Sequence, residues 1–202
     1  MLTARIAVIA SGGGTNLQAL IDAQGRGKLK SGSIALVIAD KAGIGASQRA
    51  GKAGIPCAVI VRKEPEFEEK VLAVLAEYNI DMVILAGFLG IFSGGFIQKF
   101  HGPIINIHPA LIPSFCGKGF YGLRVHQAAL DYGVKVTGAT VHYASEVVDG
   151  GQIIAQKAVD VLPGDTPEIL QRRVMEQAEW VLLPQAAELV SAQIVHEKES
   201  NI

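Results

Sequence analysis

Short apolar runs alternate with amphipathic segments through the first half of the chain. Residues 5–10 form a continuous, largely β-branched run, which is typical of a strand buried on both faces. The same reasoning predicts further strands at 34–39, 58–61, 81–86 and 103–107, and helices at 15–23, 46–53, 65–78 and 94–100. Pro65 is expected in the first turn of its helix. This alternation predicts a parallel sheet with right-handed crossovers and helices on both faces.

The pattern becomes irregular after the fifth predicted strand. Between His108 and Leu123, prolines and glycines interrupt any period, which favours a functional loop. Beyond it we expect a helix at 125–132, strands at 136–143 and 152–159, and a final helix at 166–190 that Thr166 caps. Pro184 should kink or interrupt that helix. The predicted fold class is α/β: a single doubly wound, Rossmann-like domain over 1–202, with a mostly parallel sheet flanked by helices.

The composition limits the class of protein. Lys and Arg number 18 and Asp and Glu 19, so the net charge of −1 lacks the basic excess of nucleic-acid binders. Half of the residues are hydrophobic, which supplies a core, and two cysteines cannot form a disulfide framework. The apolar run before Ser11 is too short for a signal peptide, and glycines break the longest uncharged stretch. We expect a cytoplasmic protein that binds neither nucleic acid nor membrane.

A glycine-rich loop follows the first predicted strand, with the sequence Ser-Gly-Gly-Gly-Thr-Asn at 11–16. Ligands bind at such strand ends, and the free N–H groups of a helix start favour phosphate. Leu17 stands where a dinucleotide fingerprint needs its third glycine, and no lysine precedes Thr15 as in a P-loop. A mononucleotide-type phosphate is therefore favoured. Asp40, at the end of the second strand, keeps a dinucleotide open, and a turn without ligand is the other alternative.

Two polar residues end the fifth predicted strand. Asn106 and His108 are two positions apart and so share one face, at the end of the sheet where ligands bind. An amide beside an imidazole can stabilise a developing oxyanion. Asp149, in a tight turn between two later strands, could take or relay a proton in concert with His108. The alternatives are a buried structural histidine, a capping amide and an Asp-Gly turn.

Other catalytic chemistries lack their signatures. No serine lies in a nucleophile elbow, Cys116 has no catalytic motif around it, and the five histidines show no paired spacing for a metal. We therefore expect no metal.

These segments together resemble the folate-dependent formyltransferase family from residue 5 to about 190. The matching segments are Ser-Gly-Gly-Gly-Thr-Asn-Leu-Gln-Ala at 11–19, Leu-Ala-Gly-Phe at 85–88, Asn-Ile-His-Pro-Ala-Leu-Ile-Pro at 106–113, Val-His-Gln-Ala-Ala-Leu at 125–130, Gly-Ala-Thr-Val-His at 138–142 and Asp-Gly-Gly-Gln-Ile-Ile at 149–154. The resemblance implies formyl transfer from 10-formyltetrahydrofolate, as co-substrate, to the amine of glycinamide ribonucleotide in purine biosynthesis. It implies small-molecule partners, a phosphate-binding half over about 1–100 and a folate and catalytic half over about 101–190. A homodimer stays open.

The resemblance also implies roles for individual residues. Asn106, His108 and Asp149 would be catalytic, with His142 in support. Gly14, Thr15 and Asn16 would bind the substrate phosphate, and Glu179 its ribose, unless Glu179 only solvates a helix surface. The folate-binding residues would be Asn106 together with Phe88, Leu89, Gly90, Ile91, Phe92, Ile97, Ala144, Ser145, Glu146, Val147 and Val148.

The sequence departs from the family pattern in two places. Gly90 stands where many members carry arginine, so that side chain's contact is missing. The loop at 115–123 is longer than is usual, and Lys118 and Arg124 there could reach a folate tail or only face solvent.

Three rival functions make different demands on the chain. A methionyl-tRNA formyltransferase would need a C-terminal domain and a basic surface, which 202 residues and a charge of −1 do not provide. A formyltetrahydrofolate deformylase usually carries an N-terminal domain, yet here the first strand begins at Arg5. A non-catalytic nucleotide-binding module would use the glycine loop alone.

Overall fold

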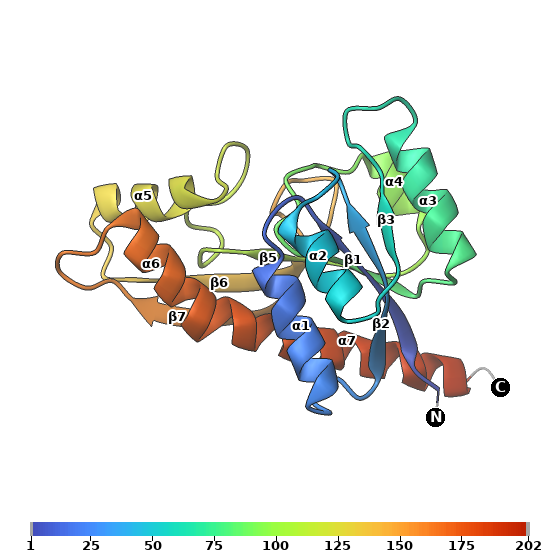
Figure 1. The fold of residues 1–202 in the computed structure, drawn as a ribbon. Helices are drawn as coiled ribbons and strands as arrows, with labels where there is room; N and C mark the ends of the chain where they lie inside the picture. The colour runs from blue at the N-terminus through green and yellow to red at the C-terminus, as the bar shows by residue number, and fades with distance from the viewer. Residues whose placement is uncertain (1, 201–202) are drawn as a thin grey trace.

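The structure is a computed structural model and describes residues 2–200. Its centre is one seven-stranded sheet in the order β3-β2-β1-β4-β5-β6-β7 (Figure 1). The strands are β1 (Ala4–Ala10), β2 (Gly32–Ala39), β3 (Cys57–Val59), β4 (Met82–Leu85), β5 (Ile104–His108), β6 (Val136–Tyr143) and β7 (Ile153–Asp160). The first five run parallel, whereas β6 pairs antiparallel with both β5 and β7. The prediction of a mostly parallel, doubly wound sheet is confirmed.

Helices cover both faces of this sheet (Figure 1). They are α1 (Thr15–Gly25), α2 (Gly45–Lys52), α3 (Phe67–Glu77), α4 (Gly94–Lys99), α5 (Leu123–Tyr132), α6 (Pro167–Val174) and α7 (Trp180–Ser200), with a π-helical turn, η1 (Met175–Glu179), between the last two. Helices α1, α2, α6 and α7 bury apolar side chains against one face, and α3 and α4 against the other.

The alternation along β1 explains why both faces need a cover. Ile6 and Val8 pack into the core on the α1 and α7 side, whereas Ala7 and Ile9 pack into the core on the α3 and α4 side. All four side chains are fully buried. A strand with apolar residues on both faces is stable only between two layers of helices, because each exposed face would leave its apolar area in water.

Two predicted helices differ from the structure. Pro65 lies before α3 rather than in its first turn, because Glu66 has a left-handed backbone (φ 61°) and the helix begins at Phe67. The final helix does begin after Thr166, whose hydroxyl accepts a bond from the Ile169 N–H. It is not broken at Pro184, however, and continues to Ser200. The irregular turn is η1, just before Trp180, whose carbonyl would be the partner of the N–H that Pro184 lacks.

The sheet topology places the candidate site. The chain leaves β1, β4 and β5 at the same end of the sheet, as parallel neighbours must. The glycine loop, the segment after β4 and the pair Asn106 and His108 therefore meet there. None of the helices in residues 2–200 is long and apolar enough to span a bilayer.

Candidate active site

A cavity of about 680 Å³ opens at the carboxyl ends of β1, β4 and β5. Its walls also include the loop at 117–122, the connection between β6 and β7, and one face of α6 and η1. The residues predicted from sequence that line it are Thr15, Asn16, Phe88, Leu89, Gly90, Ile91, Phe92, Ile97, Asn106, His108, His142, Ala144, Ser145, Val147, Val148, Asp149 and Glu179. Segments far apart in the sequence thus converge on one cavity.

His108 and Asp149 lie next to each other in the wall of this cavity. Nδ1 of His108 lies 3.6 Å from Oδ2 of Asp149, and the Nε2–H of His108 donates to the Phe115 carbonyl at 2.9 Å. Asp149 adopts a left-handed backbone (φ 55°), which an aspartate tolerates better than most residues, and accepts a 2.8 Å bond from the Gly117 N–H. The bond from Gly117 therefore holds the Asp149 carboxylate beside the His108 imidazole.

The surroundings of the pair set opposite charge states. Burial lowers the pKa of His108 and outweighs the Asp149 charge and the Phe115 carbonyl, which raise it. Burial raises the pKa of Asp149, but His142, the Gly117 N–H and His108 together outweigh it and leave that pKa below its usual range. At neutral pH, a neutral imidazole thus lies beside an ionised carboxylate. His108 can therefore accept a proton, and the Asp149 charge stabilises the imidazolium that forms.

His142 connects Asn106 to the same carboxylate. Asn106 and His142 are paired residues of β5 and β6, and Nδ2 of Asn106 lies 3.1 Å from Nε2 of His142. That Nε2 is 3.6 Å from Oδ1 of Asp149, and the Nδ1–H of His142 donates to the Tyr143 carbonyl. Because its second amide hydrogen stays available, Asn106 can donate to an oxygen in the cavity while His142 fixes its orientation.

The glycine loop begins α1 with backbone groups directed at the cavity. Gly12 and Gly13 line it, as do Thr15 and Asn16. Gly14 does not: it is buried with φ 72°, and a Cβ there would lie 2.7 Å from Cα of Ala46. Its carbonyl accepts the first helical bond, from Gln18. Gly14 thus lets the loop pass close to α2, and no side chain among the described residues caps α1.

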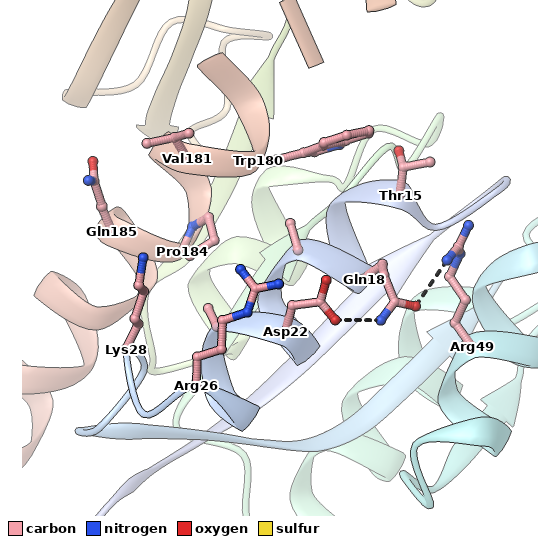
Figure 2. Close-up of a pocket in the computed structure, with 12 residues that line it drawn as sticks. Thr15, Gln18, Asp22, Arg26, Lys28, Arg49, Trp180, Val181, Pro184 and Gln185 are labelled. Carbon is pink, nitrogen blue, oxygen red and sulfur yellow. Dashed lines mark hydrogen bonds between the residues drawn. The ribbon is translucent and has the colours of Figure 1, made fainter. Parts of the chain in front are cut away.

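Arg49 of α2 supports the loop from behind. Its Nε donates to the Gly13 carbonyl at 2.9 Å and its Nη1 to Gln18 Oε1 at 2.9 Å, while Gln18 in turn donates to Asp22. Figure 2 shows the bonds of Gln18 with Arg49 and Asp22, which line a second cavity, of about 480 Å³, between α1 and α7. Because the carbonyl lone pairs of Gly13 are engaged by a cation, the loop presents its N–H groups rather than its oxygens to an anion.

Asn16 and Glu179 form a buried pair at one wall of the cavity. Nδ2 of Asn16 donates to Oε2 of Glu179 at 2.6 Å, although 163 residues separate them. Burial raises the pKa of Glu179, and the Asn16 bond only partly offsets it. The other carboxyl oxygen of Glu179 can accept from a hydroxyl in the cavity, as the predicted ribose contact requires.

Another wall of the cavity carries an aromatic cluster. The rings of Phe88 and Phe92 stack with centroids 5.1 Å apart, and Phe92 stacks on Phe96 at 3.9 Å. The side chain of Glu146 turns away from the cavity, accepts a bond from Gln98 at 3.1 Å and approaches Gly94 on α4. Its predicted folate contact therefore lacks side-chain support, because α4 holds the carboxylate.

Several lining residues were missed by sequence reasoning. Gln171 and Met175 precede Glu179 by eight and four positions, so helical spacing from Glu179 could have identified them. Arg62 and His126 gave no local signal, whereas the loop at 117–122 lies within the segment that the sequence marks as a functional loop. Lys118 lines the cavity, whereas the Arg124 guanidinium lies over the Tyr121 ring. Within residues 2–200, no three potential ligands gather as a metal site needs.

Known proteins resemble this chain closely. The formyl transferase family matches residues 4–186. The trifunctional purine biosynthetic protein adenosine-3 of Homo sapiens is 47% identical over 193 residues, which is 94% of this chain and 18% of that protein. The phosphoribosylglycinamide formyltransferase of Haemophilus influenzae is 39% identical over 184 residues, covering 89% of this chain and 84% of that protein. This chain thus spans about a fifth of the length of the trifunctional relative.

The solved structures agree on the fold. The glycinamide ribonucleotide transformylase 1 of Symbiobacterium toebii superposes with a TM-score of 0.87 at 38% identity, covering 95% of this chain and 89% of that one. The family match, over residues 4–186, includes the sheet, the glycine loop and the strand that carries Asn106 and His108. This chain belongs to the formyl transferase family.

Proposed function

We propose that this chain transfers the formyl group of 10-formyltetrahydrofolate to the amine of glycinamide ribonucleotide, a step of de novo purine biosynthesis. The proposal rests chiefly on one observation: a single cavity joins the Asn106, His108 and Asp149 side chains to a glycine loop suited to a phosphate. Family membership supports it, and so do the names of relatives that align over most of their length.

The chemistry follows from the charge states of the catalytic residues. The substrate amine attacks the formyl carbon, a C–N bond forms, and the carbonyl oxygen becomes negative. Asn106 donates to that oxygen, and His108 takes up a proton beside Asp149 as the amine loses one. The bond between carbon and the folate nitrogen then breaks, and that nitrogen receives the proton. Catalysis thus combines oxyanion stabilisation with a proton relay.

The nucleotide would occupy the wall made by the glycine loop and Glu179. Its phosphate would accept from the N–H groups at the start of α1 and from Thr15 and Asn16, with the helix dipole adding to the attraction. The free oxygen of Glu179 would accept from a ribose hydroxyl. The folate would occupy the opposite wall, between the segment 88–92 and the connection 144–148.

The decisive experiment measures tetrahydrofolate released from 10-formyltetrahydrofolate, with and without glycinamide ribonucleotide. We expect release that requires the nucleotide. Release without it would identify a hydrolase of the deformylase type. A folded protein that releases none under either condition, but binds the nucleotide, would be a binding module. The control is His101→Ala, since His101 is exposed and lies outside the cavity.

We also propose the organisation that the sequence suggests. The phosphate-binding half would cover about 1–100 and the folate and catalytic half about 101–190 of one domain, working on small molecules in the cytoplasm. Cell fractionation tests the location. Sedimentation at several protein concentrations tests whether the chain forms a homodimer.

A further inference from the structure

Asp40 is a candidate ligand contact from the sequence that does not line the cavity. It follows β2, the strand end where a ribose contact was an alternative, yet its side chain is only 1% exposed and does not line the cavity. Its Oδ2 accepts a 2.7 Å bond from the Ser11 hydroxyl, and its Oδ1 has no partner among the described residues. Burying a carboxylate costs free energy unless hydrogen-bond donors or a cation beside it offset the loss of water.

Ser11 joins that carboxylate to the segment after β4. Its hydroxyl, which donates to Asp40, accepts a 2.9 Å bond from the Leu89 N–H. Its own N–H donates to the Gly87 carbonyl at 3.2 Å. Ser11 opens the glycine loop, so these bonds fix the wall proposed for the folate against the wall proposed for the phosphate. An ionised acceptor strengthens the bonds, because Asp40 orients and polarises the hydroxyl.

Arg62 closes the network from the other side. Its Nε lies 3.8 Å from Oδ2 of Asp40, and its Nη1 donates to the Leu89 carbonyl at 2.5 Å. Leu89 is therefore held at both its N–H and its carbonyl. In residues 2–200, no other cation lies within ion-pair distance of Asp40.

Gly90 fits this arrangement. A Cβ there would collide with the Phe88 ring and would lie 2.9 Å from Cδ of Arg62. A side chain at this position would have to displace the Phe88 ring and the Arg62 side chain. Gly90, Arg62 and Asp40 are thus parts of one arrangement.

We propose that Asp40 is a positioning residue that, through Ser11 and Arg62, holds the segment 87–91 against the glycine loop and so maintains the folate wall of the cavity. Asp40 touches neither substrate. The inference rests on the proposed function for the identity of the ligand on that wall.

The test compares Asp40→Ala, Asp40→Asn and Ser11→Ala with the wild type. We expect Asp40→Ala and Ser11→Ala to raise KM for 10-formyltetrahydrofolate about tenfold, the effect of losing one or two such bonds. In Asp40→Ala, KM for the nucleotide and kcat should change less than threefold. Asp40→Asn keeps an oxygen that accepts from Ser11 and should restore KM to within threefold. The control is Asp131→Ala, an exposed aspartate on α5.

Equilibrium binding of tetrahydrofolate, measured by calorimetry, separates the two proposals. If the wild type binds tetrahydrofolate and Asp40→Ala binds it about tenfold more weakly, the positioning role stands even if no formyl transfer occurs. Unchanged folate affinity in folded Asp40→Ala or Ser11→Ala would overturn it. So would equal losses for both substrates together with a lower Tm, since this is the result of a merely structural role. If Asp40→Ala does not fold, Ser11→Ala gives the decision.

Discussion

At the scale of single residues, the charge state of His108 depends on a balance between burial and one carboxylate. Burial lowers its pKa, and Asp149 at 3.6 Å works against that effect. The imidazole is therefore neutral and able to accept a proton at neutral pH, and it becomes protonated only when the pH falls below its pKa. The value of kcat/KM, which reports on the free enzyme, should therefore decrease at acid pH, below the ordinary histidine pKa of about 6.5.

Asp149→Asn should lower kcat by about 10²–10⁴-fold, because the proton on His108 loses the charge that stabilises it. The Asp149 charge raises the pKa of His108, so removing it should lower that pKa further. The acid limb of kcat/KM should then move to lower pH. Rates of tetrahydrofolate release across pH 5–8 measure this, with exposed Asp160→Asn as control. An acid limb that stays in place would contradict the assigned pair.

His126 is a buried histidine that the proposed chemistry does not use. Burial, aided by the charge of His108, lowers its pKa to about 4, and neither ring nitrogen has a hydrogen-bond partner within residues 2–200. In the unfolded chain a histidine titrates near 6.5. Between these values the unfolded state binds more protons, so stability rises with pH across this window and falls as pH decreases.

His126→Gln should therefore flatten the pH dependence of unfolding. From the pKa of about 4, the wild type should lose about 2 kcal/mol of unfolding free energy between pH 7 and pH 5 through this residue. Urea titrations at the two pH values give the difference. His196→Gln, on the exposed side of α7, should keep the wild-type slope. An unchanged slope in His126→Gln would show that folding does not lower the pKa of His126.

The sequence identified those site residues whose neighbours along the chain reveal them. The two-residue period of β5 directed Asn106 and His108 to one face, and the tight turn marked Asp149. The environment of Asp40 could not be found in this way, because its partners Ser11 and Arg62 come from two other loops. The bond between Asn16 and Glu179 spans 163 residues, so no local pattern reports it.

At the scale of elements, the close packing of α1 on α2 restricts which residue can stand at position 14 of the glycine loop. Gly14 has φ 72° and approaches the backbone of Ala46, whereas Gly25, at the other end of α1, is exposed and has open space around its Cα. The same substitution at the two ends of one helix should have opposite effects.

Gly14→Ala should destabilise the protein by about 1–3 kcal/mol and weaken nucleotide binding, since a Cβ forces the loop away from α2. Gly25→Ala should be neutral or stabilise by up to about 1 kcal/mol. Thermal unfolding and nucleotide KM measure both variants. Equal stability of the two would argue against the close approach at Ala46.

Local patterns predicted the elements well, with exceptions that have physical causes. The strands and most helices follow apolar periodicity and turn residues. The π-turn η1 does not, because it reflects where the chain accommodates Pro184 and how α6 and α7 pack on the sheet. The start of α3 was misplaced because Glu66 takes a left-handed backbone, for which its side chain gives no signal.

At the scale of the whole molecule, the net charge of −1 means that anion binding has to be local. The helix start, Thr15 and Asn16 would supply it, so a bound nucleotide would tie the first helix to the last. Such a ligand stabilises only the folded state.

Glycinamide ribonucleotide at about 100 times its Kd should therefore raise Tm by about 5–10 °C, from roughly 2.7 kcal/mol of linkage. Glu179→Ala should reduce this shift at the same concentration, whereas Glu176→Ala, on the exposed side of η1, should not. Differential scanning calorimetry measures the shifts. The same shift in both variants would remove Glu179 from the nucleotide site.

The overall topology was predictable because strands and helices alternate. The strand direction was not: β6 and β7 read as strands from sequence, but their antiparallel pairing beside five parallel strands depends on long-range packing. That reversal places His142 opposite Asn106, and so the support for the catalytic amide came only with the structure.

The distance in sequence between Asn16 and Glu179 also bears on how the protein assembles. Asn106, His108, His142 and Asp149 lie within 44 consecutive residues, so their part of the cavity can form from one stretch of chain. The Asn16–Glu179 pair must instead close a loop of 163 residues, a contact that comes late when a chain is made from its amino end. During synthesis the glycine loop precedes Glu179 by 163 residues, so the buried Asn16–Glu179 bond, and the part of the nucleotide wall that it builds, forms only after η1 has left the ribosome.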